Sequence, residues 1–487
     1  MEHTLGAMLE DTSRRYPDRI SLLYKDRSVS YAGLNRAVNI FGNRLLKLGV
    51  TKGDKVAIML PNTPDFVISY FAILKIGAVA VTINTMSTSH ELLYLLDNCD
   101  ARAFITIPSS AKRFEAIRET LPLCEHLITT DDPLDDPSIT EPVEMNTFNL
   151  DMPKIDLNDP AVMIYTSGLT GKPLGAVLTH HNLSSTQSTL LEDVCHGSAD
   201  DRGLCLIPLF HSFGATSNML MVLKAGASVV MIDHFNLENI FKTIEAKKVT
   251  YIAAVPRVFL GMLLFEGADN YDTGSLRFCV TGGSAMPPEY MPMFEKKFGI
   301  TLVQGYGLTE ASPVCSVSRI DGTQKPGSIG LPIPGVETKV VDETGSPLSA
   351  DGIGELLIRG LNVMKGYYKN PTATADVIKN GWLHTGDLAR IDEDGHIFLE
   401  GRMKRMIITS GFNVYPAEIE NVLRMHPEVK DARVTGRKDL MRGEIVRALV
   451  TKTPGASVND KDLMKHCREY LSSYKTPREI EFVEKIN

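Results

Sequence analysis

Short apolar runs alternate with longer amphipathic stretches through the first part of the chain. Residues 55–60 and 78–83 are apolar runs of strand length, and 31–48 and 65–76 carry apolar residues at helical spacing. Strand, helix and strand in this order predict parallel strands joined by crossover helices. Similar short apolar runs follow at 203–207, 228–231, 251–255 and 278–280. We therefore expect an α/β fold with a large N-terminal domain of mixed and parallel sheets.

The pattern changes after about residue 325. Gly and Pro become frequent, and residues 338–341 and 355–358 alternate between apolar and polar, as strands with one exposed face do. Residues 387–401 predict a hairpin that turns at 393–395. These features predict a β-rich subdomain over about 325–403, which completes an N-terminal domain over 1–403.

A new mixture of helical and strand patterns begins after Arg402. Helices are expected at 416–425 and 460–471, and strands at 431–435 and 445–451. We predict a small α+β C-terminal domain over 404–487. Inside the larger domain, the acidic, proline-containing stretch 132–158 is expected to be an exposed connector.

The composition limits the class of protein. The chain has 487 residues, too many for one compact core, and its net charge of −8 argues against a general binder of nucleic acid or anionic membranes. Its 7 cysteines are scattered without a C-x-x-C pair, which is typical of reduced cytoplasmic thiols and not of disulfides or a zinc site. The start of the chain does not have the pattern of a signal peptide, and no stretch predicts a membrane span.

A glycine-rich polar loop lies between two apolar runs, 162–165 and 176–178. Its polar and turn-forming residues are Thr166, Ser167, Gly168, Thr170, Gly171, Lys172 and Gly175. Glycines let backbone N–H groups point inward, while hydroxyls and a lysine add donors and charge, and such a loop can cradle phosphate. The spacing is not that of a Walker A loop, and no helix follows as in a Rossmann turn. Taken alone, the pattern also fits a plain surface loop.

Further motifs follow the loop along the chain. They are PLFHSFG (208–214), TGGSAMPP (281–288), QGYGLTE (304–310), GWLHTGD (381–387) and GFNVYPAEIE (411–420). Each alone has a plain explanation, such as a structural histidine, a glycine turn or a solvated charge. Together and in this order they resemble the acyl-adenylate-forming superfamily over roughly residues 20–487. Within it, the chain is most similar to bacterial medium- and long-chain fatty acyl-CoA synthetases.

The resemblance implies an acid–thiol ligase that uses ATP, Mg²⁺ and CoA. A carboxylic acid, expected to be a medium- or long-chain fatty acid, would react with ATP to give acyl-AMP and pyrophosphate, and CoA would then take the acyl group. The residues implied to bind the nucleotide are Thr166, Ser167, Gly168, Thr170, Gly171, Lys172, Gly283, Ser284, Ala285, Gly305, Tyr306, Gly307, Asp387 and Arg402. Of these, Tyr306 is expected to stack on adenine, and Asp387 to bind the ribose hydroxyls with Arg402 beside it.

The same resemblance assigns catalytic roles. Thr309 is expected to bond the phosphate, and Glu310 to hold Mg²⁺ with Thr166 as a second contact. His211 is expected between the nucleotide and the acyl group. The cap domain would rotate between the two steps about a hinge at Lys404, and it would bring Gly411 to the thioester-forming channel.

The chain departs from the family pattern in two places. Leu169 and Leu174 stand where the family usually has a Ser or Thr and a Lys, so the handling of ATP or pyrophosphate is expected to be weakened. The pattern also continues beyond 482–487 into a Gly-Lys pair, so we expect either a shortened chain or a tail outside this sequence.

Three functions stay open at this point. The first is an acyl-CoA ligase with a weakened phosphate loop. The second is a nucleotide- or acyl-binding pseudoenzyme, and the third is a ligase that loads the thiol of an acyl carrier protein. The apolar residues around 210–221 favour an aliphatic or aryl acid over an amino acid. The resemblance also implies a homodimer, whereas neither a nucleic acid nor a membrane is expected as a partner.

Overall fold

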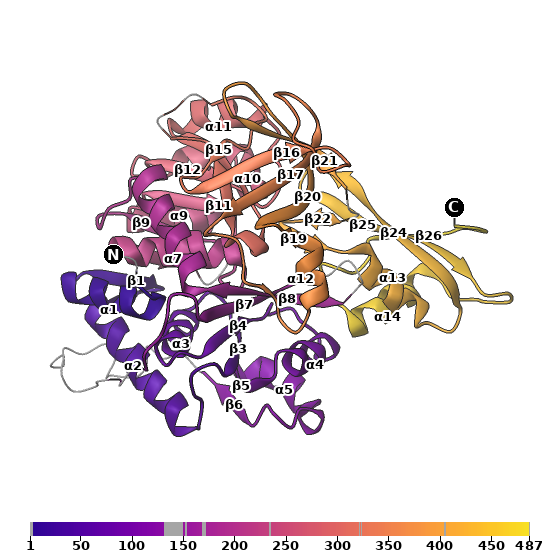
Figure 1. Ribbon diagram of the computed structural model, residues 1–487, viewed down its shortest axis with the longest axis horizontal. Helices are drawn as coiled ribbons and strands as arrows, with labels where there is room; N and C mark the ends of the chain where they lie inside the picture. The colour runs from indigo at the N-terminus through magenta and orange to yellow at the C-terminus, as the bar shows by residue number, and fades with distance from the viewer. Residues whose placement is uncertain are drawn as a thin grey trace.

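The computed structural model describes residues 3–130, 150, 153–167, 172–232, 235–320, 322, 324–403 and 406–486. Most of the predicted connector therefore lies outside the described residues, as do Gly168, Thr170, Gly171 and Lys404. Of Ser167 only the backbone is described. In the described part of the chain the strands form four sheets, three of them in the larger domain (Figure 1).

The glycine-rich loop joins two strands of a mainly parallel sheet. The strand order is β18 (Gly366–Tyr367), β8 (Pro173–Thr179), β7 (Pro160–Ser167), β4 (Val79–Thr82), β3 (Lys55–Met59), β5 (Ala101–Thr106) and β6 (His126–Thr129). Strands β7, β4, β3, β5 and β6 run parallel, as the strand–helix–strand pattern predicts. The helices of this part are α1 (Leu5–Arg15), α2 (Tyr31–Lys47), α3 (Pro64–Lys75), α4 (Ser89–Asn98), α5 (Pro108–Glu115) and η1 (Arg118–Thr120). Every residue of α3 is buried, which agrees with its mostly apolar sequence, although Asp65, Ser69 and Lys75 are buried as well.

A second sheet carries the TGGSAMPP and QGYGLTE motifs. Its order is β15 (Leu331–Pro332), β14 (Val314–Val317), β13 (Thr301–Gly307), β12 (Phe278–Thr281), β11 (Tyr251–Ala254), β9 (Arg202–Cys205), β10 (Ser228–Met231), β1 (Ile20–Tyr24) and β2 (Arg27–Ser30). The helical segments here are α7 (His180–Thr189), η3 (Leu190–Val194), η4 (Gly214–Leu220), α8 (Met221–Ala225), α9 (Leu237–Lys247), α10 (Pro256–Leu264), η5 (Ala268–Asn270), α11 (Tyr290–Phe298) and η6 (Thr309–Ala311). Because β12 and β13 are parallel neighbours, the two motifs leave the sheet at the same edge.

The predicted β-rich subdomain forms a third sheet, orange in Figure 1. Its elements are β16 (Val336–Val341), β17 (Gly354–Gly360), β20 (Trp382–Ile391), β19 (Ile378–Lys379), β21 (Ile397–Arg402) and α12 (Pro371–Val377). Strands β20 and β21 form the predicted hairpin, in which Asp387 lies opposite Arg402. The subdomain also sends β18 back to pair with β8.

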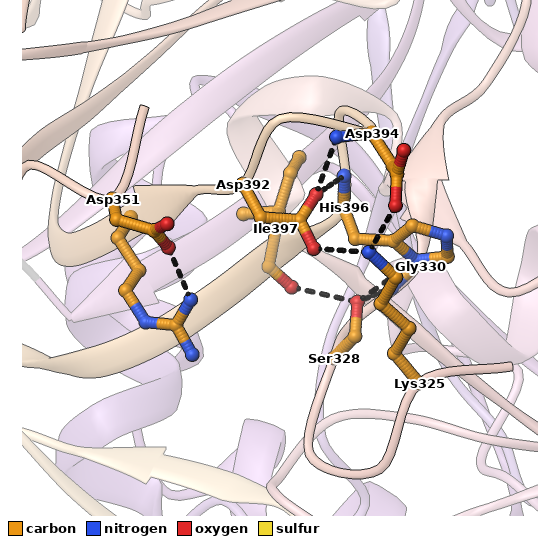
Figure 2. A network of polar contacts seen from close by, with 9 residues as sticks. Lys325, Ser328, Gly330, Asp351, Asp392, Asp394, His396 and Ile397 are labelled. Atoms are coloured by element: carbon orange, nitrogen blue, oxygen red, sulfur yellow. Dashed lines mark hydrogen bonds and ion pairs between the residues drawn. The ribbon is translucent and has the colours of Figure 1, made fainter. Parts of the chain in front are cut away.

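A polar network ties the turn of this hairpin to the loop before β15 (Figure 2). The ammonium of Lys325 lies 2.5 Å from Asp392 Oδ2 and 2.6 Å from Asp394 Oδ2. The hydroxyl of Ser328 donates to the carbonyl of Ile397 at 2.9 Å. Because that loop leads into the second sheet, the network fixes the hairpin against the sheet that carries the QGYGLTE motif.

The C-terminal cap has its own sheet and hydrophobic core, yellow in Figure 1. Its elements are β22 (Ile407–Thr409), β23 (Phe412–Val414), α13 (Pro416–Arg424), β24 (Val429–Asp439), β25 (Gly443–Lys452), α14 (Asp460–Tyr470) and β26 (Glu479–Phe482). The expected helices and strands of this region are present within a few residues of their predicted bounds. The predicted boundary at Lys404 falls on a residue outside the described ranges.

The seven cysteines all lie in described parts of the chain, where each is buried and free. Burial raises the pKa of the Cys99, Cys124 and Cys205 thiols to about 12, so these groups stay protonated near neutral pH. Among the described residues, none of the helices is both long enough and apolar enough to cross a bilayer.

Candidate active site

A cavity of about 270 Å³ lies where the β7–β8 hairpin, the ends of β12 and β13, the β20–β21 hairpin and the cap meet. The predicted site residues that line it are Thr166, His211, Gly283, Gly305, Tyr306, Gly307, Thr309, Glu310, Asp387, Arg402 and Gly411. Ser284 and Ala285 follow Gly283 on the same loop but are not among the residues that line the cavity. The fold thus brings together residues from the glycine-rich loop and the five motifs that follow it along the sequence.

The carboxylate of Glu310 accepts hydrogen bonds from two hydroxyl groups. Thr166 at the end of β7 donates to Glu310 Oε1 at 3.1 Å, and Tyr367 on β18 donates to the same oxygen at 2.8 Å. Burial and then the charge of Glu310 raise the pKa of Tyr367, so its hydroxyl stays a donor. Strand β18 pairs with β8, and this pairing holds Tyr367 near the glycine-rich loop.

Asp387 is held by two partners. Tyr306 donates its hydroxyl to Asp387 Oδ2 at 2.6 Å, and Arg402 Nε lies 2.9 Å from Asp387 Oδ1. Burial and then the carboxylate raise the pKa of Tyr306 well above its ordinary value. The predicted ribose ligand is therefore fixed by the predicted adenine-stacking residue and by its cross-strand neighbour.

His211 has a neutral ring. Burial lowers its pKa to about 4, and its Nδ1 accepts the backbone N–H of Phe213 at 3.2 Å. A neutral imidazole that accepts at Nδ1 carries its proton at Nε2, so His211 can donate one hydrogen bond. Nearby, the hydroxyls of Ser212 and Thr309 lie 3.3 Å apart.

Two glycines of these motifs are required by the backbone. A Cβ at Gly307 would lie 1.6 Å from the carbonyl oxygen of Pro313, so no side chain fits there. Gly283 has a φ of +80°, a conformation that favours glycine. These positions let the main chain form the cavity wall itself.

Comparison with known proteins agrees with this geometry. The model of a family described as AMP-binding enzyme matches residues 9–368, and that of the AMP-binding enzyme C-terminal domain matches residues 418–487. The chain belongs to the AMP-binding enzyme family. The fold predicted from the motifs, a large α/β domain with a smaller C-terminal domain, is confirmed.

Relatives of this AMP-binding enzyme act on different acids. A long-chain-fatty-acid–CoA ligase of Bacillus subtilis (strain 168) is 33% identical over 514 residues, covering 99% of this chain and 91% of the relative. A feruloyl-CoA synthase of an Amycolatopsis species is 32% identical over 487 residues, covering 99% and 95%. The solved structure of an o-succinylbenzoate CoA synthetase variant from Bacillus subtilis has a TM-score of 0.88 at 28% identity, covering 100% and 96%. Family membership establishes an AMP-forming acid–CoA ligase without fixing the acid.

One end of the cavity is apolar. The residues that line it are Leu190, Val194, Cys195, Phe213, Ser217, Met221, Tyr251, Val280, Val314 and Val317. The two polar side chains of this wall, Ser217 and Tyr251, hydrogen-bond to each other. Gly282 also lines the cavity, whereas residues 330–334 are not among its lining residues.

The structure shows where Leu174, one of the two leucines that depart from the family pattern, lies. Leu174 lines the cavity and lies opposite Thr166 in the β7–β8 register. Lys172 is exposed and lines a second cavity instead. Leu169 lies outside the described residues. The leucine at 174 thus presents apolar surface beside the hydroxyl that bonds Glu310.

The second cavity, of about 540 Å³, lies between the cap and the first sheet. The residues that line both cavities are Thr166, His211, Thr309 and Asn413. The cap loop with Gly411, which lines the first cavity, packs against the larger domain, because a Cβ at Gly411 would lie 2.6 Å from Val255 Cγ1.

Two tyrosines of the cavity, Tyr367 and Tyr415, are not among the site residues that the sequence predicts. Tyr367 bonds Glu310, and Tyr415 lines the cavity with its pKa raised by burial and then by Glu310. Both lie within glycine-containing segments, NVMKGYY (362–368) and GFNVYP (411–416), but such a segment does not reveal which distant carboxylate its tyrosine will contact.

Proposed function

We propose that this enzyme converts a medium- or long-chain fatty acid to its CoA thioester through an acyl-AMP intermediate. The observation that carries the proposal is a single cavity with Glu310, Asp387 and Arg402 at its polar end and aliphatic side chains at the other. Such a cavity suits a substrate with a reactive polar head and a long apolar tail.

In the first step, a carboxylate oxygen attacks the α-phosphorus of ATP and pyrophosphate leaves. The reaction needs alignment and neutralisation of negative charge more than it needs covalent help from the protein. Thr309 would bond the phosphate, Asp387 would bind the ribose, and Arg402 beside it would add positive charge. Tyr306 would support the adenine with its ring while its hydroxyl keeps Asp387 in place.

The residues around Glu310 suit Mg²⁺. This ion prefers one or two carboxylates together with phosphate oxygens, and Glu310 lies among hydroxyl groups with Thr166 directly beside it. Glu310 and Thr166 would hold the ion, which would reduce the charge on the phosphate oxygens when bound.

In the second step, the sulfur of CoA attacks the acyl carbon and AMP leaves. We assign the second cavity to the approach of the thiol, because it meets the first at His211 and Thr309. His211 would donate from Nε2 to an oxygen of the carboxyl or acyl group. It would not serve as a general base, because Nδ1 already accepts the N–H of Phe213.

The apolar end of the cavity supports an aliphatic acid. The polar pair Ser217 and Tyr251 is satisfied internally, so a polar or charged tail would enter without a partner there. Among the described lining residues of this end, none is an acid or a base that could bind an ammonium or a second carboxylate.

The test is an acid panel in two assays. ATP-dependent release of pyrophosphate reports the first step, and acyl-CoA measured by mass spectrometry reports the full reaction. Octanoate, dodecanoate and hexadecanoate should exceed ferulate, benzoate and amino acids in kcat/KM. A preference for ferulate would overturn the fatty-acid assignment. Acyl transfer to a carrier protein but not to CoA would overturn the assignment of the acceptor, and absence of pyrophosphate release with every acid would indicate a pseudoenzyme.

A further inference from the structure

Lys475 joins the cap to the larger domain through a buried ion pair. Its ammonium lies 2.7 Å from Glu91 Oε1 of the larger domain and 2.7 Å from Glu418 Oε1 of the cap. All three side chains are buried. Among the described residues, Lys475 with Glu91 is the ion pair that crosses between the domains, at a point where α4 and α14 are in contact (Figure 1).

Polar and aromatic contacts surround this pair. Ser472 donates its hydroxyl to Glu91 Oε2 at 2.6 Å, and Thr88 donates its hydroxyl to the carbonyl of Tyr470 at 3.0 Å. The rings of His90 and Tyr470 meet edge to face, with 5.2 Å between their centroids. Each contact also runs between the larger domain and the segment 470–475 of the cap.

Glu91 is held in position by its own helix. It is the third residue of α4 and forms a capping box, in which Glu91 Oε2 accepts the backbone N–H of Thr88 at 2.9 Å and the Thr88 hydroxyl accepts the N–H of Glu91. The carboxylate of Glu91 is therefore already ordered before the cap docks against the larger domain. The sequence Thr88-Ser89-His90-Glu91 builds a fixed acceptor at the domain boundary.

The two carboxylates around Lys475 are not equivalent. Burial opposes the charge on Glu91, but Lys475, Ser472 and the N–H of Thr88 outweigh it and lower the pKa of Glu91. Burial dominates at Glu418 and raises its pKa, and Glu418 Oε2 is buried without a hydrogen-bond partner in the described structure. Of the two carboxylates, Glu91 therefore ionises more readily, and it is the one that faces Lys475 across the domain boundary.

We propose that Lys475 and Glu91 form a clasp that holds the cap in the orientation that encloses the second cavity, and that both are positioning residues for thioester formation. The step assigned to them rests on the proposed function. Both residues line the second cavity, so the clasp is part of its wall. A buried pair of this kind exists only while water is excluded, so the clasp breaks when the cap rotates away. It therefore stabilises one cap orientation without contact with the nucleotide.

The kinetic test uses Glu91→Gln in the full chain. Glutamine retains an acceptor for the N–H of Thr88 but removes the charge opposite Lys475. Consumption of supplied acyl-AMP by CoA should slow by about 10–100-fold, whereas ATP-dependent pyrophosphate release should change by less than about 3-fold. Lys475→Arg, which keeps the charge, should stay closer to the wild type than Lys475→Met. Equal loss of both half-reactions in Glu91→Gln would overturn the proposal.

Glu10→Gln is the matched control. Glu10 is the ionic partner of Lys75 at 2.9 Å, and this pair lies wholly within the larger domain with the side chain of Lys75 fully buried. The control should lower stability without changing the ratio of the two half-reactions. A similar change of the ratio in Glu10→Gln would show that general destabilisation explains the effect and would overturn the clasp.

Hydrogen exchange tests the clasp without reference to activity. In Glu91→Gln, backbone exchange at residues 88–92 and 470–475 should become faster than in the wild type, with the sheets of the larger domain unchanged. In Glu10→Gln, exchange in these two segments should match the wild type. Unchanged exchange in Glu91→Gln would overturn the clasp even if the enzyme is active. If the wild type activates no acid, the proposed function fails while exchange still decides on the clasp.

Discussion

Asp387 illustrates how the fold gives a single side chain its role. An isolated Asp in the sequence is most simply a solvated charge, but here its two oxygens are occupied by Tyr306 and Arg402. The register of the β20–β21 hairpin sets one partner and the edge of the second sheet supplies the other. The type of residue was readable from the GWLHTGD motif, whereas the bond to Tyr306 was not, because 81 residues separate the two.

Leu174→Lys tests the departure in the glycine-rich loop. A lysine beside Thr166 would offer a charge-assisted bond to phosphate, so pyrophosphate release should rise by about 10-fold or the KM for ATP should fall by a similar factor. Both are read from steady-state kinetics at varied ATP. Leu264→Lys, at an exposed leucine of α10 that lines neither cavity, should have no effect. No change in Leu174→Lys would show that our interpretation of this loop is wrong.

Gly305→Val tests the apolar end of the cavity. A Cβ at Gly305 would lie 3.7 Å from Val317 Cγ2 and 3.9 Å from Val280 Cγ1, so the fold should tolerate the side chain. The added methyl groups should shorten the space for the acyl tail. We expect kcat/KM for hexadecanoate to fall by about 10-fold or more relative to octanoate in the same preparation. An unchanged ratio would place the acyl tail elsewhere.

At the scale of elements, the site depends on where strands end. Strands β12 and β13 stop at the same edge, β18 returns to pair with β8, and the loop before β23 enters from the cap. The individual strands were predictable because apolar runs and turn residues are local signals. Their neighbours were not, since β18 is two residues long and finds its partner 189 positions away, where Gly366 pairs with Val177.

Gly411→Ala tests the contact of the cap loop with the larger domain. Gly411 has a φ of +86°, and a Cβ there would lie 2.6 Å from Val255 Cγ1, so alanine should displace the loop. Thioester formation from supplied acyl-AMP should fall by about 10-fold or more, with pyrophosphate release nearly retained. Gly455→Ala is the control, because Gly455 is also in the cap, has a φ of +79° and has no atom within 4 Å of a Cβ. An equal loss of thioester formation in Gly411→Ala and Gly455→Ala would show that backbone strain, and not the contact with Val255, causes the effect.

At the scale of the whole molecule, two domains share one reaction. The cap contributes Gly411, Asn413 and Tyr415 to the first cavity and Lys475 to the second. Enclosure by a separate domain excludes water from an acyl-AMP, which would otherwise hydrolyse. Such an arrangement requires the cap to move if substrates are to enter and products to leave.

Lys404→Pro tests the predicted hinge, which lies outside the described residues. Proline restricts the backbone at this position, so it should block the change of cap orientation and not the chemistry of either orientation. Acyl-AMP formation should be nearly intact while thioester formation is lost, as measured by the two half-reaction assays. Lys404→Ala is the control and should leave both steps unchanged. A proline elsewhere, such as Lys369→Pro, would not serve, because Lys369 has a positive φ that proline cannot adopt. Equal loss of both steps in Lys404→Pro would contradict the assignment.

The stability of the larger domain should depend on pH through His180. Burial lowers its pKa to about 4 from 6.5, and its Nδ1 accepts the N–H of Leu5. The unfolded chain binds a proton more readily, so the contribution of neutral His180 is complete above about pH 6.5 and is lost progressively as the pH falls towards 4. From about pH 7.5 to about pH 5 this linkage should cost about 2 kcal/mol. The thermal midpoint should therefore drop less on acidification in His180→Gln than in the wild type. His3→Gln, at an exposed histidine, should follow the wild type.

The sequence by itself determined the local elements, the domain order and the set of chemical groups. Apolar periodicity depends on neighbours within a few residues, and ordered motifs such as QGYGLTE carry their resemblance without coordinates. The tertiary structure alone decided which groups meet: Tyr306 with Asp387, Tyr367 with Glu310, and Lys475 with Glu91. These contacts join residues 57 to 384 positions apart, and they form only when whole sheets and domains pack. The sequence shows that a lysine stands at position 475, but only burial and the carboxylate opposite it determine what that lysine can do.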